Sequence, residues 1–429
     1  MDGETMELYE LNYSDLSLLS SEKVAESPEE AQRLESVARM VMETLGPNGP
    51  GLLAITGVPR ASSFRRNLLP LARKLALLSD EDRKKLLKEH NLGSDVPLKN
   101  LERIVSSFAK KLEYDKRFKS NYHYSRESDQ LRVVKGDEQL EADRIGFKNL
   151  GNIFNELGFC MMEVGLRIAQ VCDKLIRGNE LQVSLLESGT AKGRLIHYHS
   201  TIDNEFIKKT VGANISVKKG AKPMACDEWQ QWHYDYGIFT ILTAPMFIFS
   251  SSNNEGLFPI TEEIKNPCIP CDQESSSPSG HTYLEIFHPS KDQTFMVKAP
   301  PESLIVQVGE AADILSKGKL QATLHRVCRP QEPKNLSRET FVVFLQPAWS
   351  KQFSLSDYPL NKQLHSNDHS CKFCTKEMLN REKIDSETLN ICSIIPPLSS
   401  RLRDGMTFAD FSRATTNQYY GSNGLQSSR

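Results

Sequence analysis

The stretch Trp232-His-Tyr-Asp-Tyr-Gly-Ile-Phe-Thr-Ile-Leu-Thr-Ala-Pro-Met-Phe-Ile-Phe249 decides the fold prediction. Its apolar, β-branched and aromatic residues after Gly237 predict a buried strand. At the entrance of this strand, His233 and Asp235 are two positions apart, and residues at that spacing on a strand point to one face. An imidazole and a carboxylate could therefore meet at one metal ion. By itself, however, such a pair is more typical of an ordinary hydrogen-bonded surface pair than of a metal site.

A second strand-like region farther along the chain supplies a candidate third ligand. Residues 304–309, Leu-Ile-Val-Gln-Val-Gly, lead to the segment Leu324-His-Arg-Val327, which presents His325. Arg338 and Thr340 then precede an apolar strand and share one strand face. The alternatives are a satisfied core histidine at 325 and a solvated strand-end arginine at 338.

In order and in composition, these segments resemble the Fe(II)- and 2-oxoglutarate-dependent dioxygenases, especially the plant group that includes isopenicillin N synthase-like enzymes. The resemblance covers about residues 190–350 and is far more specific than any single motif. The segments that carry it are His233-x-Asp235, Val308-Gly-Glu310, Leu315-Ser-Lys-Gly318, His325-Arg-Val327, Arg338-x-Thr340 and Leu345-Gln-Pro347. It implies a mainly β core, a double-stranded β-helix or jelly roll, with α-helices packed on its N- and C-terminal sides.

The resemblance also implies a set of site residues. His233, Asp235 and His325 would bind Fe(II) as a facial triad of two imidazoles and one carboxylate. Arg338 would hold the far carboxylate of 2-oxoglutarate with its planar guanidinium, and Thr340 would add a hydroxyl donor.

One further contact to the cosubstrate is implied by the segment His197-Tyr-His-Ser200. Many members of the family read Asn-Tyr-Tyr-Pro there, and the second tyrosine reaches the cosubstrate. In this chain His199 stands in the place of that tyrosine. We therefore expect His199 to face 2-oxoglutarate and Tyr198 to face the opposite way.

The expected activity is oxidation of a small organic substrate by dioxygen, either hydroxylation or desaturation, with release of succinate and CO2 from 2-oxoglutarate. Two alternatives stay open. One is a catalytically degenerate binding or scaffold protein on the same fold, with a structural zinc site. The other is an iron oxidase that does not use 2-oxoglutarate, because relatives use a similar Arg-x-Thr pair for substrate carboxylates.

An insertion of about residues 250–281 separates Asp235 from His325, and its Pro- and Ser-rich sequence predicts a long loop near the substrate entrance. It contains one of two Cys-x-x-Cys pairs, and the second lies after the core. A four-thiolate zinc site is the hypothesis for them, and free reduced thiols are the favoured alternative. The four cysteines are Cys268, Cys271, Cys371 and Cys374.

Composition narrows the setting of the protein. The 429 residues are 39% hydrophobic and 25% charged, which is typical of a globular chain with a large core. A formal net charge of −2 gives no electrostatic case for nucleic acid as a partner. We find neither a signal peptide nor an apolar run long enough to span a membrane. We therefore expect an intracellular, cytoplasmic protein, with the nucleus left open, and the sequence is silent on its oligomeric state.

The chain divides into four predicted regions. Residues 1–140 form an N-terminal helical region around one strand (51–58), with a helix starting at Ser27-Pro28 and another over 64–88 that Pro70 could break. Residues 141–189 carry one long helix, because apolar side chains recur every three or four positions over 150–175. The jelly-roll core occupies 190–350, and 351–429 is a C-terminal extension with a closing helix.

Overall fold

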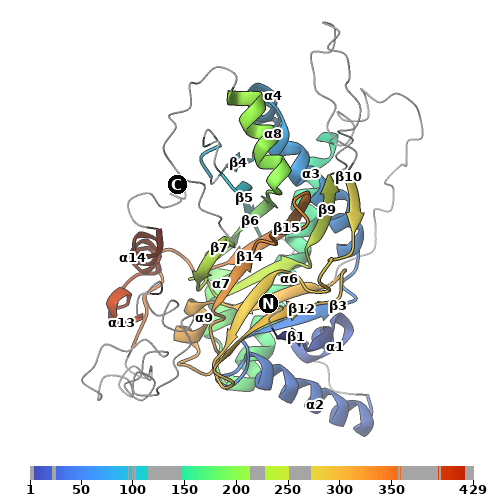
Figure 1. Ribbon diagram of the computed structural model, residues 1–429. Helices are drawn as coiled ribbons and strands as arrows, with labels where there is room; N and C mark the ends of the chain where they lie inside the picture. Colours follow the sequence, from blue (N-terminus) through green and yellow to red (C-terminus); the bar gives the residue numbers. More distant parts are fainter. Residues whose placement is uncertain are drawn as a thin grey trace, which may run out of the picture.

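The computed structural model describes residues 4–21, 26–94, 96–98, 100, 103–114, 147–212, 228–250, 272–355, 358, 395 and 398–420. Their strands form two sheets, which lie face to face with helices packed outside (Figure 1). The smaller sheet has the order β1-β12-β11-β14-β7, and the larger has the order β2-β3-β13-β8-β15-β6-β5-β4, with β9 pairing both β15 and β10. This is the mainly β, jelly-roll architecture that the sequence predicted.

The strands of the smaller sheet are β1 (Thr5–Glu7), β7 (Glu228–His233), β11 (Leu284–His288), β12 (Gln293–Lys298) and β14 (His325–Cys328). Those of the larger sheet are β2 (Glu10–Asn12), β3 (Leu52–Thr56), β4 (Gly93–Ser94), β5 (Val105–Glu113), β6 (Thr190–Tyr198), β8 (Phe239–Thr243), β9 (Met246–Ser250), β10 (Asp272–Ser275), β13 (Leu304–Val308) and β15 (Leu336–Leu345). The helices are α1 (Tyr13–Ser20), α2 (Pro28–Leu45), α3 (Ala61–Leu77), α4 (Asp80–Glu89), α6 (Leu150–Ile176), α7 (Glu180–Ser188), α8 (Thr201–Gly212), α9 (Glu310–Leu315), α13 (Leu398–Arg401) and α14 (Phe408–Tyr420).

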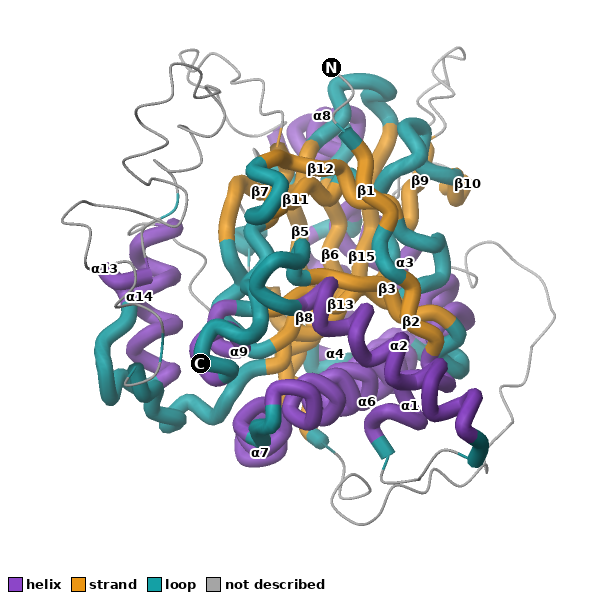
Figure 2. Tube along the Cα trace, turned by 90° about the horizontal axis from the view of Figure 1, so that it is seen from below, coloured by secondary structure: helices purple, strands orange, loops and turns teal. Residues whose placement is uncertain are grey.

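Strand alternation divides the larger sheet between two cores. On β15, Phe341, Val343 and Leu345 face a core shared with α1, α2, α3 and α6, which Figure 2 shows grouped along one side of the strands. Val342 belongs instead to the core between the two sheets, together with residues of β11, β12 and β14. Successive side chains on a strand point to opposite faces. Odd-numbered and even-numbered residues of β15 therefore enter different cores. The core between the sheets also contains Tyr198 of β6, whose ring lies against Arg338 of β15.

The N-terminal helices confirm part of the sequence prediction. Helix α2 begins with Ser27 as its N-cap and Pro28 at its first turn, and β3 forms within the predicted strand. The predicted break at Pro70 is wrong, because Pro70 lies inside α3 and the chain breaks instead at Leu78 and Ser79, where Ser79 caps α4. The region also holds more than one strand: β1, β2, β4 and β5 were not predicted.

The strand that follows the metal pair is shorter than predicted. The apolar run after Gly237 forms two strands, β8 and β9, separated by Ala244 and Pro245. A proline cannot donate a hydrogen bond to a neighbouring strand, which accounts for the interruption. The predicted loop over 250–281 also contains β10, which pairs antiparallel with β9.

The long helix and the closing helix confirm the sequence predictions as α6 and α14. The three boundaries between the four predicted regions stay a prediction. All four cysteines of the zinc hypothesis, Cys268, Cys271, Cys371 and Cys374, lie outside the described residues.

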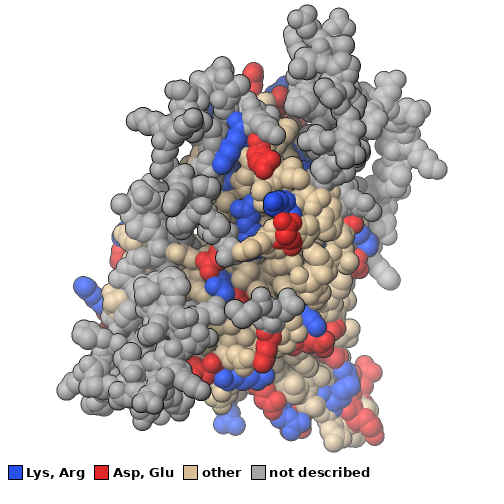
Figure 3. All heavy atoms as spheres, viewed as in Figure 1, with Lys and Arg blue, Asp and Glu red and all other residues tan. Residues whose placement is uncertain are grey.

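The surface in Figure 3 carries acidic and basic side chains side by side over its lower part, in keeping with a formal net charge of −2. Helix α2 illustrates the mixture, since its exposed face includes Glu29, Arg39 and Glu43. Among the described helices, none is both long enough and apolar enough to cross a membrane.

Candidate active site

The three predicted metal ligands come together at the adjacent ends of β7 and β14. His233 is the last residue of β7 and His325 is the first of β14, and the two are directly paired, with ring centroids 4.2 Å apart. Asp235 lies two residues beyond β7, in a loop rather than on the strand. One oxygen of its carboxylate is 3.9 Å from Nε2 of His233, and the other is 3.9 Å from Nε2 of His325. One ligand atom from each residue lies within 4.8 Å of the others.

Backbone carbonyls select the same tautomer for both imidazoles. Nδ1–H of His233 donates to the carbonyl of Gln231 at 2.8 Å, and Nδ1–H of His325 donates to the carbonyl of Thr323 at 3.0 Å. Each Nε2 therefore keeps a lone pair, and each Nε2 lies 3.9 Å from an oxygen of Asp235. Metal-bound histidines usually donate their other ring N–H in this way. The residues present thus fit a metal ion.

Burial keeps the imidazole of His233 neutral. Burial lowers the pKa of His233, and the adjacent His325 lowers it further. The Asp235 carboxylate raises the pKa, but the net result is a pKa of about 4. Neutral imidazole is the form that binds a metal. Asp235 is itself oriented by Thr240 of β8, whose hydroxyl donates to Oδ2 at 2.6 Å. Two imidazoles and one carboxylate with the remaining positions open are typical of non-haem Fe(II) oxygenases.

Two polar residues connect the triad to β6. The side-chain amide of Gln230 donates to Nε2 of His233 at 2.9 Å, and the hydroxyl of Tyr198 donates to Oε1 of Gln230 at 3.3 Å. Gln230 reaches the same face as His233, three residues away, because the pairing of β7 with β14 is irregular at this point. The lone pair that Gln230 contacts is the one a metal would take.

Arg338 and Thr340 lie on β15, on the face that looks into the space between the sheets. Arg338 is 1% exposed, and its Nε donates to the carbonyl of Thr282 at 2.9 Å. Its guanidinium carbon lies 5.1 Å from the ring centroid of Tyr198. Burial lowers the pKa of Arg338. Within the described part of the chain, Arg338 forms no ion pair with a carboxylate, so its buried charge is available to an acidic ligand.

The hydroxyl of Thr340 lies at the neighbouring position on this face. It donates to the carbonyl of Thr243 at 3.2 Å and lies 3.4 Å from the hydroxyl of the same residue. The predicted pair Arg338 and Thr340 thus lies on the face of β15 that packs against the core between the sheets. Tyr198 and Gln230 connect Arg338 to His233 of the triad.

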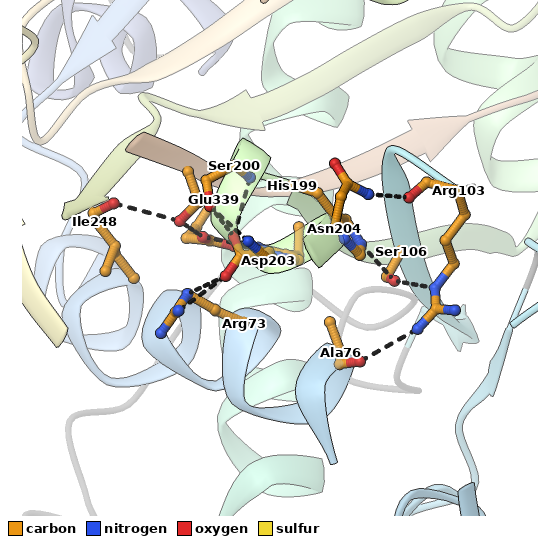
Figure 4. Close-up of polar contacts among 12 residues, drawn as sticks. Arg73, Ala76, Arg103, Ser106, His199, Ser200, Asp203, Asn204, Ile248 and Glu339 are labelled. Carbon is orange, nitrogen blue, oxygen red and sulfur yellow. Dashed lines mark hydrogen bonds and ion pairs between the residues drawn. The ribbon is translucent and has the colours of Figure 1, made fainter. Parts of the chain in front are cut away.

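The prediction for His199 is wrong, because its side chain lies on the opposite side of the sheet. Tyr198, not His199, is paired directly across from Arg338. The ring of His199 lies 4.4 Å from that of His197, and its Nε2 is 2.9 Å from the hydroxyl of Ser106 (Figure 4). Burial and the nearby positive groups lower the pKa of His199 well below its usual value. A one-residue error in face assignment exchanges the two surfaces of a strand.

A buried network of charges occupies the side of the sheet where His199 lies. His197 contacts both oxygens of Glu339 at 2.9 Å, and Nε2 of His197 is 3.5 Å from Asp203. Arg73 of α3 donates two hydrogen bonds to Oδ1 of Asp203, at 3.0 and 2.8 Å, as Figure 4 shows. Burial raises the pKa of Asp203, but His197, Arg73 and Ser200 lower it by more. The network joins α3, β6 and β15 behind Arg338.

Sequence reasoning missed Tyr198, Gln230 and Thr240 as members of the site. Tyr198 could have been found from strand pairing, because residues paired directly across two strands point to the same face of the sheet. If Tyr198 pairs with Arg338, the two side chains must share a face. The irregular pairing of β7 could not be predicted, and with it the position of Gln230.

The comparisons with known proteins agree with this geometry. Residues 272–347, which contain His325, Arg338 and Thr340, match the 2OG-Fe(II) oxygenase superfamily. A comparison with curated proteins gives no significant match.

Several solved structures resemble the chain at low identity. A rice dioxygenase for auxin oxidation is 15% identical with a TM-score of 0.48, and the alignment covers 95% of this chain and 94% of that one. JOX2 in complex with 2OG, Fe and JA is 13% identical with a TM-score of 0.48, covering 98% and 88% of the two chains. A full-length Neurospora crassa protein in complex with alpha-KG and thymine is 14% identical with a TM-score of 0.45, covering 96% and 97%. With TM-scores below 0.5, these likenesses decide nothing about the substrate of this chain.

The jelly-roll fold and the His-Asp-His triad define a class of mononuclear, non-haem metal oxygenases. The family match is more specific: residues 272–347 match the 2OG-Fe(II) oxygenase superfamily, whose cofactors are Fe(II) and 2-oxoglutarate.

Proposed function

We propose that this protein couples the oxidative decarboxylation of 2-oxoglutarate to the hydroxylation or desaturation of a small organic substrate, with dioxygen consumed and succinate and CO2 released. We place it in the plant-type, isopenicillin N synthase-like group on the order of its motifs. The observation that carries the proposal is the position of the buried guanidinium of Arg338. It lies on the ring of Tyr198, whose hydroxyl is linked through Gln230 to His233. No described carboxylate forms an ion pair with it.

In this proposal His233, Asp235 and His325 hold Fe(II), which when bound supplies the redox chemistry for activating dioxygen. The protein holds two neutral imidazoles, each with a lone pair on Nε2, close to the carboxylate of Asp235. The carbonyls of Gln231 and Thr323 fix the two rings. The amide of Gln230, which donates to Nε2 of His233, would have to leave that atom for a metal to bind there.

The cosubstrate would lie between the metal and β15. Arg338 would hold its far carboxylate, because a planar guanidinium can pair with a carboxylate through two parallel hydrogen bonds. Thr340 and Tyr198 would add hydroxyl groups on either side. An unpaired guanidinium in a buried site is costly, and a ligand carboxylate offsets that cost. This requirement favours a dicarboxylate cosubstrate over a neutral one.

The test is anaerobic addition of Fe(II) and then 2-oxoglutarate to the purified protein, followed by oxygen. We expect the visible charge-transfer absorption of a chelated keto acid, and then succinate. Asp235→Asn should lose the bound iron and the absorption band, whereas Asp292→Asn, on an exposed turn, should keep both. If the wild type develops neither the band nor succinate, the proposal is wrong. Iron-dependent oxygen uptake that does not require 2-oxoglutarate would favour the alternative of an iron oxidase.

A further inference from the structure

The loop that carries Asp235 is held by the start of α9. Because Asp235 lies outside β7, strand pairing does not fix it. Its carbonyl instead accepts a hydrogen bond from the backbone N–H of Glu310 at 2.8 Å, and the carbonyl of Gly237 accepts one from Ala311 at 3.0 Å. The position of the carboxylate ligand therefore depends on where α9 begins.

The first residue of α9 is in turn held by the C-terminal segment. The carboxylate of Glu310 accepts two hydrogen bonds from Arg401 of α13, at 2.7 and 2.6 Å. Both side chains are buried, with 1% of Arg401 and 5% of Glu310 exposed. Arg401 also donates to the hydroxyl of Thr415 of α14 at 2.9 Å, which joins both C-terminal helices to the ion pair. Paired hydrogen bonds of this kind fix distance and direction together.

A second contact reaches the loop from α14. The ring of Phe408 lies 5.9 Å from the ring of Tyr236, the residue that follows Asp235. Figures 1 and 2 both place α13 and α14 at one side of the molecule, next to α9. The C-terminal segment is thus connected to the loop that carries Asp235 in two ways. One is the ion pair of Arg401 with Glu310, and the other is the contact of Phe408 with Tyr236.

We propose that Arg401 and Glu310 are positioning residues for the metal ligand Asp235, so that the C-terminal segment sets the affinity of the metal site. This inference rests on the proposed function, because it takes Asp235 as a ligand. Residues that hold a ligand in place typically contribute about 10- to 100-fold in metal affinity. The ion pair acts through the backbone N–H of Glu310, and neither of its side chains touches the metal.

Co(II) binding under anaerobic conditions tests the proposal, with affinity and the visible d–d spectrum as readouts. Arg401→Lys keeps the charge and removes the fork, and Glu310→Gln keeps the shape and removes the charge. Both should weaken Co(II) binding by about 10- to 100-fold and alter the spectrum, which reports ligand geometry. The matched control is Arg73→Lys, which disrupts an equally buried ion pair with Asp203 on the far side of the larger sheet. It should lower stability but leave Co(II) affinity within about twofold of the wild type.

Equal loss of Co(II) affinity in Arg401→Lys and Arg73→Lys would overturn the proposal, and so would no loss in Arg401→Lys and Glu310→Gln. If those two variants do not fold, Thr415→Val decides the question, because it removes one hydrogen bond of Arg401. It should weaken Co(II) binding about two- to fivefold, and unchanged binding would count against the inference. A wild type that binds no Co(II) would remove the proposed function as well. A wild type that binds Co(II) no better than these variants would remove this inference alone.

Discussion

Tyr198 and Arg338 occupy directly paired positions on β6 and β15, and the guanidinium carbon lies 5.1 Å from the centre of the phenol ring. Through Gln230, Tyr198 is also connected by hydrogen bonds to His233 of the triad. On the other face of the same two strands, His197 and Glu339 form a second directly paired contact. The sheet therefore separates the proposed ligand-binding face from a buried charge network by a single residue step.

We predict that Tyr198→Phe weakens 2-oxoglutarate binding about tenfold, since a hydrogen bond to a charged group contributes about 1.5 kcal/mol. His199→Gln should leave the dissociation constant unchanged, because His199 faces the other side of the sheet. Anaerobic titration of the Fe(II) protein with 2-oxoglutarate measures both. A larger effect of the His199 variant would restore the sequence-based assignment of His199 to the cosubstrate.

Arg338→Met should abolish 2-oxoglutarate binding without destabilising the protein. The guanidinium is buried and its pKa is lowered by burial, so its removal relieves an unfavourable charge in the ligand-free state. We expect the free energy of unfolding, measured by urea denaturation, to be unchanged or about 1 kcal/mol higher. Arg73→Met is the contrast, because it leaves Asp203 buried and unpaired and should cost about 3–5 kcal/mol. Similar losses of stability in the two variants would show that Arg338 is structural.

Gly309→Ala should displace the loop that carries Asp235. A Cβ atom at Gly309 would lie 2.2 Å from the carbonyl oxygen of Gly237 and 3.0 Å from that of Asp235, which no side chain can tolerate without a backbone shift. We expect a loss of about 1–3 kcal/mol of stability and weaker Fe(II) binding. Gly93→Ala is the control, because its Cβ would approach nothing closer than 3.8 Å. Wild-type iron affinity in Gly309→Ala would contradict this account of the loop.

The buried His199 predicts an acid sensitivity of the fold. Burial lowers its pKa well below the usual 6.5, so below pH 6.5 the unfolded state binds a proton that the folded state does not. The free energy of unfolding should fall as the pH falls through this range, with His199 contributing about 1.4 kcal/mol per pH unit. His199→Gln should reduce the slope by that amount in urea denaturation at about pH 5–6.5. An identical slope in the two proteins would mean that His199 is already protonated in the fold.

Local patterns were sufficient for several elements and for the choice of ligands. The apolar repeat over 150–175 predicted α6, and the Ser27-Pro28 start predicted the N-terminus of α2. The order of His233, Asp235, His325 and the Arg-x-Thr pair resembles a known oxygenase family, and that resemblance implied the mainly β fold. These features depend on periodicity and motif order, which can be read along the chain.

Pairing between distant segments decided the rest. Which of Tyr198 and His199 enters the site depends on the register of β6 against β15, and a shift of one residue reverses every face. Asp235 is placed by Glu310, and Glu310 by Arg401, which is 91 residues farther along the chain. No sequence pattern records such a contact, because it forms only when the C-terminal helices pack beside α9. The sequence by itself determined which side chains could bind a metal and a dicarboxylate, and the tertiary structure decided which of them face the site and what holds them there.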